Sequence, residues 1–395
     1  MARFNLNAIQ KTLTDFKLNG WLFSDYRGND PLGKRILNLS NHVRHTRRWY
    51  YFIPQSGVPM KIVHSIERDI LDSLPGKKIV YMGWQEMEAK LKSLFNPGAR
   101  IAVQYSPNNA IPYVSRLDAG TYELLHSFKL KLISSADLLQ LFVAKWTDSQ
   151  LNTHKNAARQ LYEVVENTFR YVKRKVKGHQ EINELKTQKY VMTEIKRRGL
   201  IFDHVPIVAV GKNSGIPHYY PSPDRNDPVY RGSLLQLNLW AKEKGESAVY
   251  AIIAWVGYIG DQVPAEYSEK FKLICDARDS AVKYIDSAMK KGKAIHGWEV
   301  DEMVRNHLAE QGYDSYFLHR TGHSIGRQVH DTGVNIDNLE TRDERQIIAK
   351  TCFTIEPALY FSDYGMRTEI NVFVDSKGAH VYTQPIQTEI VPILR

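Results

Sequence analysis

Two glutamates in the C-terminal part of the chain adjoin short apolar runs of the kind that form β-strands. Glu356 directly follows CFTI, and Glu369 directly precedes INVFV. If these runs form neighbouring strands, both carboxylates lie at strand ends and converge on one point. His323 lies within the glycine-containing bend GHSIG, seven residues before His330, and such a bend would let two imidazoles face one cavity. Imidazoles and carboxylates together suit zinc, manganese, iron or cobalt.

Each of these residues has a simpler explanation when it is taken alone. A histidine beside a glycine is commonly a hydrogen-bonded structural residue, and a glutamate at a strand end is commonly solvated. The combination, in this order and with these flanking residues, is far more specific than any single member. The sequence therefore predicts a His/Glu cluster around which the C-terminal part is built.

Four blocks of the sequence resemble the signature blocks of the pita-bread metallopeptidases, namely GKNSGIPHYY, HRTGHSIGRQVHD, FTIEPALY and GMRTEINVFV. That family includes aminopeptidase P, prolidase, methionine aminopeptidase and the metal-free enzyme creatinase. The resemblance is closest to aminopeptidase P or prolidase, because a separate N-terminal domain precedes the blocks. It is strong over residues 150–395 and extends to residues 1–145 only in layout.

The resemblance implies an α+β fold with two domains. Residues 1–147 would form a smaller α/β creatinase-like domain, and residues 148–395 a pita-bread domain of catalytic type. A chain of 395 residues is long enough for two domains and a large core.

The family implies five metal ligands in the order Asp, Asp, His, Glu, Glu. The last three correspond to His323, Glu356 and Glu369. The two aspartates are missing, because Asn238 in LLQLNLWAK and Ile252 in YAIIAWVGYIG occupy their positions.

This loss limits how much metal the site can hold. Two carboxylates balance one divalent ion, and a second buried ion would carry uncompensated charge. Ile252 has no ligand atom, and Asn238 offers only a neutral carbonyl oxygen. The sequence therefore predicts at most one divalent ion (manganese, zinc, iron or cobalt), with a metal-free site as the alternative.

The remaining positions of the family's active site are present. The resemblance implies catalytic roles for His218 and His330 at the substrate, for Glu356 or Glu369 as a base, and for Arg367 as the group that orients the carboxylates. The simpler explanations are that His218 is a turn residue after Pro217 and that His330 is a surface residue.

Three functions are compatible with this set of residues. The first is a hydrolase of X-Pro peptides like aminopeptidase P or prolidase, with a degraded, at most mononuclear metal site. The second is an inactive pseudopeptidase that binds a peptide or protein. The third is a metal-independent, creatinase-like hydrolase of a small C–N substrate, in which His218 would move protons.

Composition and charge fit an ordinary soluble protein. Cys275 and Cys352 have neither metal-type spacing nor a disulfide framework, the N-terminus lacks a signal-peptide core, and no run is long enough to span a membrane. These features predict a cytoplasmic protein without a membrane partner. The net charge of +10 is spread along helices that also carry acidic residues, so no nucleic-acid partner is expected. The resemblance implies a small peptide or small-molecule ligand and a homodimer.

Periodicity predicts alternating strands and helices before residue 145 and long helices after it. Residues 5–17 read as an amphipathic helix, followed by strands at GWLFSDY, RWYYFIP, MKIVHSI, KKIVYMG, RIAVQYS and LKLISSA. A long helix is expected over residues 150–178, with its N-cap at Thr147 or Asp148 and its end at Gly178. Further helices are expected at residues 183–198, 265–289 and 296–312.

Overall fold

The computed structural model describes residues 4–40 and 45–395 of the chain. The chain divides into two compact units, Met1–Val143 and Ala144–Arg395. The division falls after Val143 and not after residue 147, because Trp146 packs within the second unit. Its ring lies beside those of His154 and Phe373, at centroid distances of 5.1 and 5.9 Å.

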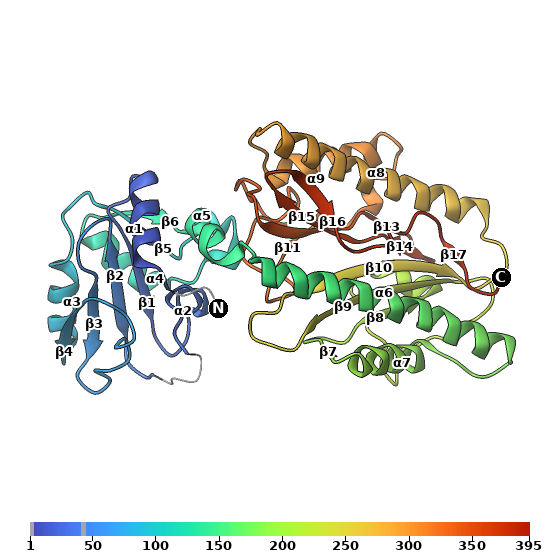
Figure 1. The fold of residues 1–395 in the computed structure, drawn as a ribbon, viewed down its shortest axis with the longest axis horizontal. Coiled ribbons are helices and arrows are strands. Elements are labelled where there is room, and N and C mark those ends of the chain that lie inside the picture. Colours follow the sequence, from blue (N-terminus) through green and yellow to red (C-terminus); the bar gives the residue numbers. More distant parts are fainter. Residues whose placement is uncertain (1–3, 41–44) are drawn as a thin grey trace. The chain divides into compact units, whose positions relative to one another are not determined.

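The described part of the first unit contains one mixed sheet with the strand order β4-β3-β2-β1-β5-β6 (Figure 1). Its core holds large apolar side chains from both faces of the central strands. The strands are β1 (Gly20–Asp25), β2 (Trp49–Pro54), β3 (Met60–His64), β4 (Lys77–Tyr81), β5 (Arg100–Val103) and β6 (Lys131–Ser134). The helices are α1 (Leu6–Asp15), α2 (Pro31–Leu37), α3 (Trp84–Lys92), α4 (Ala119–Ser127) and α5 (Ala136–Leu139).

Helix α2 is absent from the sequence-based prediction. It has only seven residues, too few for a helical period to stand out. Its ends are nevertheless marked: the Asp30 side chain accepts a hydrogen bond from Gly33 N, and Asn38 closes the helix in the left-handed conformation with φ 54°.

The second unit places β-sheets between two pairs of helices (Figure 1). Helices α6 (Asp148–Lys177) and α7 (Glu184–Arg197) pack on one sheet, while α8 (Ala265–Lys290) and α9 (Gly297–Ala309) belong to the other side. The strands are β7 (Leu200–Ile201), β8 (Ile207–Val210), β9 (Leu234–Glu243), β10 (Ala251–Tyr258), β11 (Ser324–Ile325), β12 (Thr351–Ile355), β13 (Ala358–Tyr360), β14 (Gly365–Arg367), β15 (Ile370–Asp375), β16 (Gly378–Val381) and β17 (Val391–Pro392).

Two sheets of this unit bring the predicted site together. One has the order β17-β10-β9-β7, with β8 also paired to β9, and the other has the order β11-β12-β15-β16. An isolated bridge between Ala254 and Glu369 links strand β10 to the segment that leads into β15. The two sheets are therefore adjacent at the position where the carboxylates lie.

The long helices begin close to where the sequence predicts. Thr147 is the N-cap of α6 and forms a capping box with Gln150. Gly178 is the C-cap as expected, but its φ is −86°, and the left-handed residue is the following His179, with φ 50°. In the described part of the chain, no helix has the length and apolar character needed to cross a membrane.

Candidate metal centre and cavity

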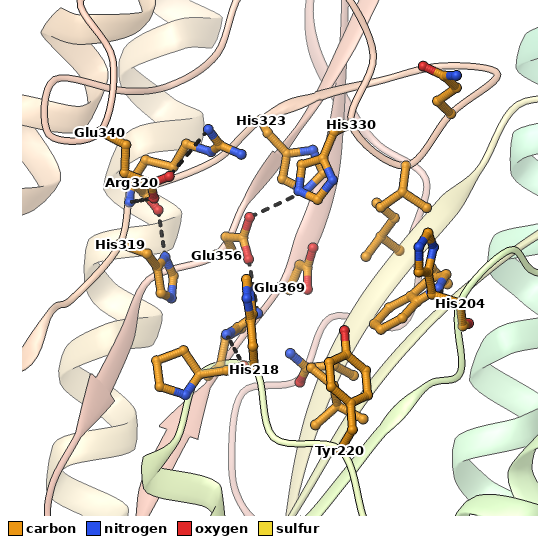
Figure 2. A pocket seen from close by; sticks show the side chains of 18 of the residues that line it. His204, His218, Tyr220, His319, Arg320, His323, His330, Glu340, Glu356 and Glu369 are labelled. Carbon is orange, nitrogen blue, oxygen red and sulfur yellow. Dashed lines mark hydrogen bonds and ion pairs between the residues drawn. The ribbon is translucent and has the colours of Figure 1, made fainter. Parts of the chain in front are cut away.

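A cavity of about 720 Å³ lies in the second unit, between the β9–β10 strands and the His323, Glu356 and Glu369 side chains (Figure 2). Every site residue predicted from the sequence lines it. These residues are His218, Asn238, Ile252, His323, His330, Glu356, Arg367 and Glu369.

Strand pairing explains why the three predicted ligands converge. Strands β12 and β15 are antiparallel with Ile355 opposite Ile370, so Glu356 just after β12 and Glu369 just before β15 are neighbours. His323 precedes β11, which pairs with β12, and its backbone N–H donates to Thr354 Oγ1 at 2.8 Å. One ligand atom from each of the three side chains lies within 4.8 Å of the others, and all three residues are buried.

The carboxylate of Glu369 is buried without a direct hydrogen bond or ion pair from the part of the chain that the structure describes. The residue is only 3% exposed. Burial, together with the charge of Glu356, raises its pKa well above the usual range for a glutamate. A buried carboxylate without a partner requires either a proton or a cation nearby.

Glu356, by contrast, has several partners. Oε1 accepts a hydrogen bond from Thr354 Oγ1 at 2.9 Å and lies 3.6 Å from His323 Nε2, while Oε2 is 3.3 Å from Arg367 Nη1. Burial raises the pKa of Glu356, and the Arg367 charge opposes that shift. Burial also holds the pKa of His323 well below its ordinary value, so the imidazole is neutral and suited to metal binding.

Arg367 is held in place by several acceptors. Its Nε donates to Tyr360 Oη at 2.8 Å, and its Nη2 donates to the same hydroxyl and, at 3.2 Å, to the carbonyl of Pro217. The anionic Glu356 and Glu369 raise the pKa of this buried guanidinium despite its desolvation. The side chain therefore fixes the orientation of Glu356.

Asn238 and Ile252, the positions where the sequence predicts lost aspartates, offer no free ligand atom. Ile252 is 3% exposed and its side chain is part of an apolar cluster. The orientation that satisfies the Asn238 amide directs its oxygen to Arg367 Nη1 at 2.8 Å and its nitrogen to the carbonyl of Leu237. The only side-chain oxygen at these positions is thus engaged by a cation of the protein.

His218 and His330 reach the cavity from opposite sides (Figure 2). The rings of His330 and His323 have centroids 4.0 Å apart. His330 is open to solvent, yet the dense protein around it, with Arg320, lowers its pKa to about 4. Burial and Arg367 lower the pKa of His218 as well. Both imidazoles are therefore neutral near pH 7 and able to exchange hydrogen bonds with a ligand.

The sequence reasoning missed other polar residues of the cavity wall. Arg320 lies 3.7 Å from Asp337 and 3.5 Å from Glu340, and the ring of His319 is 2.9 Å from Tyr360 Oη. His319 and Arg320 lie in the same HRTGHSIG block as His323, so their place in this block could have identified them as residues of the site. Glu340 comes from an irregular loop that carries no such signal.

The family model described as Metallopeptidase family M24 matches residues 152–376. The chain belongs to this family. The match contains all the site residues named above, and the family prediction and the α+β pita-bread fold are both confirmed.

Among curated proteins, this M24 chain is 29% identical over 178 residues to the uncharacterized peptidase YqhT of Bacillus subtilis, covering 45% of this chain and 46% of that protein. It is 28% identical over 179 residues to the Xaa-Pro dipeptidase of Pyrococcus horikoshii, covering 45% and 46%. The chain thus spans about half the length of these curated relatives.

A solved structure extends the similarity of fold to nearly the whole M24 chain. The dipeptidase PepE from Mycobacterium ulcerans has a TM-score of 0.74 at 20% identity, covering 98% of this chain and 96% of that one. At 20% sequence identity, this similarity is evidence for a shared fold only.

Proposed function

We propose that this chain is a hydrolase of short X-Pro peptides whose centre holds at most one divalent ion. The proposed ligands are His323, Glu356 and Glu369. The observation that carries the proposal is the buried Glu369 carboxylate, which has no partner among the described residues and faces a neutral imidazole and a second carboxylate.

The donor set fits such an ion in number and in chemistry. Three protein ligands with a further position left for water or substrate are a recognised catalytic arrangement, and one imidazole and two carboxylates supply three ligands here. Their two negative charges match one divalent cation, whereas a second cation would find only Ile252 and an Asn238 oxygen already bonded to Arg367. The single ion is therefore the stoichiometry that this chain's residues favour.

When bound, a divalent ion supplies Lewis-acid activation of water and of a carbonyl group. The chain's own residues supply orientation and proton transfer. Arg367 holds Glu356, and burial raises the pKa of that carboxylate, which makes it a better proton acceptor than an ordinary glutamate. The neutral imidazoles of His218 and His330 can donate hydrogen bonds to an oxygen that gains negative charge.

The substrate class rests on similarity together with the cavity's dimensions. One matched relative is named an Xaa-Pro dipeptidase, and a cavity of about 720 Å³ has room for a dipeptide or tripeptide. We therefore propose short peptides with proline after the first residue as the substrates.

Metal stoichiometry is the first test. The protein is purified without chelator, dialysed against manganese, and analysed by elemental mass spectrometry beside its His323→Ala variant. We expect about one tightly held ion per chain in the parent and none in the variant. A metal-free parent would exclude His323, Glu356 and Glu369 as metal ligands and would overturn metal-dependent hydrolysis, and two ions per chain would contradict the assignment of Asn238 and Ile252.

Hydrolysis of X-Pro dipeptides and tripeptides, with manganese or with EDTA, is the second test. We expect cleavage that requires manganese and that is lost in His323→Ala. Cleavage that persists in EDTA would instead identify a metal-independent, creatinase-like hydrolase. A metal-loaded protein that binds these peptides without cleaving them would be a pseudopeptidase.

A further inference from the structure

His218 lies in an irregular segment that follows the short 3₁₀ turn Gly211–Gly215 and precedes strand β9. Its imidazole lines the cavity (Figure 2), yet no hydrogen bond from a described residue reaches the ring. A side chain without a hydrogen-bond partner takes its position from the backbone that carries it. The contacts of the residues on either side of His218 therefore determine where the imidazole lies.

Glu184, the first residue of α7, is the centre of a buried hydrogen-bond network beside this segment. The residue is fully buried, and its carboxylate accepts hydrogen bonds from four groups. The donors are the backbone N–H groups of Val210 and Asp227, both at 2.7 Å, Asn213 Nδ2 at 3.1 Å, and Tyr219 Oη at 2.5 Å. Since a carboxylate has about four acceptor sites, its capacity is filled.

The network requires a carboxylate at this position and not merely a side chain of its shape. All four partners of Glu184 are donors, and an ionised carboxylate only accepts. Val210 donates to one oxygen and Asp227 to the other. A glutamine would therefore turn its NH2 group toward a backbone N–H in either orientation, which leaves a buried donor without an acceptor.

The two neighbours of His218 in the chain are held by different groups. The carbonyl of Pro217 accepts a hydrogen bond from Arg367 Nη2 at 3.2 Å, on the side of the candidate metal centre. The hydroxyl of Tyr219 donates to Glu184, on the side away from the cavity. Neither Glu184 nor Tyr219 lines the cavity, and both residues are fully buried. They can therefore affect a ligand only through the segment that they hold.

We infer that Glu184 and Tyr219 are positioning residues, which fix the imidazole of His218 at the cavity without touching a ligand themselves. This inference rests on the proposed function for the role of His218, namely a hydrogen bond to a substrate oxygen that gains negative charge. Such a donor is effective only within about 0.5 Å of the productive geometry. A loose backbone at Tyr219 would remove that precision and leave the metal ligands in place.

A double-mutant cycle tests whether Tyr219 acts through His218. In manganese-dependent X-Pro hydrolysis, we expect Tyr219→Phe to lower kcat about tenfold and His218→Ala to lower it about a hundredfold. The double variant should match His218→Ala alone, because no imidazole is left to position. Manganese affinity should be unchanged in all three, since His323, Glu356 and Glu369 lie on other segments. Losses that multiply in the double variant would overturn the inference.

Imidazole NMR tests the positioning without turnover. Proton–nitrogen correlation spectra are recorded in EDTA on the full chain, and the His218 signal is the one that His218→Ala lacks. We expect Tyr219→Phe and Glu184→Gln to broaden, split or shift that signal, because the ring no longer has one fixed environment. An unchanged His218 signal in both variants would contradict the inference.

Tyr162→Phe is the matched control for the lost hydroxyl group. Tyr162 on α6 donates to Glu166 Oε1 at 3.2 Å, so this variant also removes a tyrosine–glutamate hydrogen bond from the second unit. It should leave kcat and the His218 signal as in the parent. Glu184→Gln breaks more contacts and should lower Tm further than Tyr219→Phe. An equal effect of Tyr162→Phe on the His218 signal would exclude a specific role for Tyr219.

Failure of this inference and failure of the proposed function give different results. A His218 signal that changes in both variants, in a protein without X-Pro hydrolysis, would retain the positioning and exclude the hydrolase. Manganese-dependent hydrolysis that Tyr219→Phe leaves at the parent rate would retain the hydrolase and exclude the positioning.

Discussion

At the scale of single residues, Glu369 differs from Glu356 and Glu340 because no hydrogen bond or ion pair from a described residue reaches its carboxylate. Glu356 is bonded by Thr354 and Arg367, and Glu340 at the cavity wall pairs with Arg320. A buried carboxylate that accepts no hydrogen bond opposes folding, but it also gives a cation a point of attachment. The same side chain should therefore lower the stability of the metal-free protein and raise the affinity for metal.

Glu369→Gln separates these two effects. The amide keeps the shape of the side chain and removes the charge, so in EDTA the variant should melt at the same temperature as the parent or higher. Because a ligand is lost, manganese affinity should fall at least about tenfold and the manganese-induced rise in Tm should shrink or vanish. Differential scanning fluorimetry with manganese or EDTA measures both. Glu340→Gln is the control, and it should respond to manganese like the parent.

We expect two further residues to determine the number of ions. Restoring both carboxylates, with Asn238→Asp and Ile252→Asp together, should raise manganese stoichiometry from about one to about two ions per chain. Without metal the double variant should be less stable than the parent, since two more charges are buried. Elemental mass spectrometry and thermal unfolding in EDTA check these outcomes. Unchanged stoichiometry would mean that the site differs from the family at more than these two positions.

At the scale of secondary-structure elements, the sequence predicts the elements with an extended apolar pattern, but it does not reveal the short ones. The strands of the first unit and the long helices α6 to α9 are confirmed within a few residues, because their apolar patterns extend over many positions. Helix α2 was not predicted, because its seven residues are too few to show a helical period. The Glu356 and Glu369 pair could be foreseen from adjoining apolar runs, whereas Glu340 lies in a loop without a periodic pattern.

The apolar side of the cavity, formed by Ile207, Trp240, Ile252 and Val329, could not be predicted for a different reason. These residues are on three strands and a loop, and only the register of β8, β9 and β10 brings them together. Sequence reasoning could predict that Ile252 stands in place of an aspartate, but it could not identify the neighbours of that side chain. Pairing register is a tertiary property that local sequence does not contain.

The N-cap of α2 should make the stability of the first unit depend on pH. Burial, reinforced by Asp25, raises the pKa of Asp30 to about 7, from 3.8 for an ordinary aspartate. The folded state therefore binds more protons than the unfolded state between these values, so stability falls as pH rises from about 4 to about 7. A tenfold difference in proton affinity between the two states corresponds to about 1.4 kcal/mol, so the total effect is at most a few kcal/mol.

Asp30→Asn should flatten this pH dependence while retaining an oxygen for the cap, since asparagine caps helices as well as aspartate does. Hydrogen exchange of the buried β1 amides, corrected for intrinsic rates, measures the opening free energy between pH values of about 4.5 and about 7.5, which span most of this window. Asp30→Ala should flatten it equally, but should also lower stability by about 1 kcal/mol through loss of the cap. A parent-like slope in Asp30→Asn would contradict the assignment to this carboxyl.

At the scale of the whole molecule, each unit has cores of its own, and the candidate centre belongs to one unit only. The clusters that contain Trp21 and Tyr50 lie in the first unit, and those that contain Phe353, Leu237 and Ile252 lie in the second. All residues of the cavity lie between Asp203 and Glu369. A fragment of residues 144–395 should therefore fold and bind manganese with the stoichiometry of the full chain.

The exact start of that fragment should matter. A fragment of residues 148–395 follows the boundary predicted from the sequence, but it lacks Trp146 and the capping residue Thr147. Trp146 is 3% exposed, packs on His154 and Phe373, and has a backbone N–H that donates to the carbonyl of Lys350 at 2.7 Å. Removing a buried tryptophan costs about 3–5 kcal/mol, which lowers Tm by roughly 10 °C in a unit of this size.

Thermal unfolding of the two fragments side by side decides between the boundaries. We expect residues 144–395 to melt cooperatively and residues 148–395 to melt roughly 10 °C lower or to aggregate. Trp146→Ala in the longer fragment should reproduce most of that loss, because the ring and not the chain length is responsible. Equal melting temperatures for the two fragments would show that the segment before α6 adds nothing to the second unit. In that case the division of the chain would belong after residue 147.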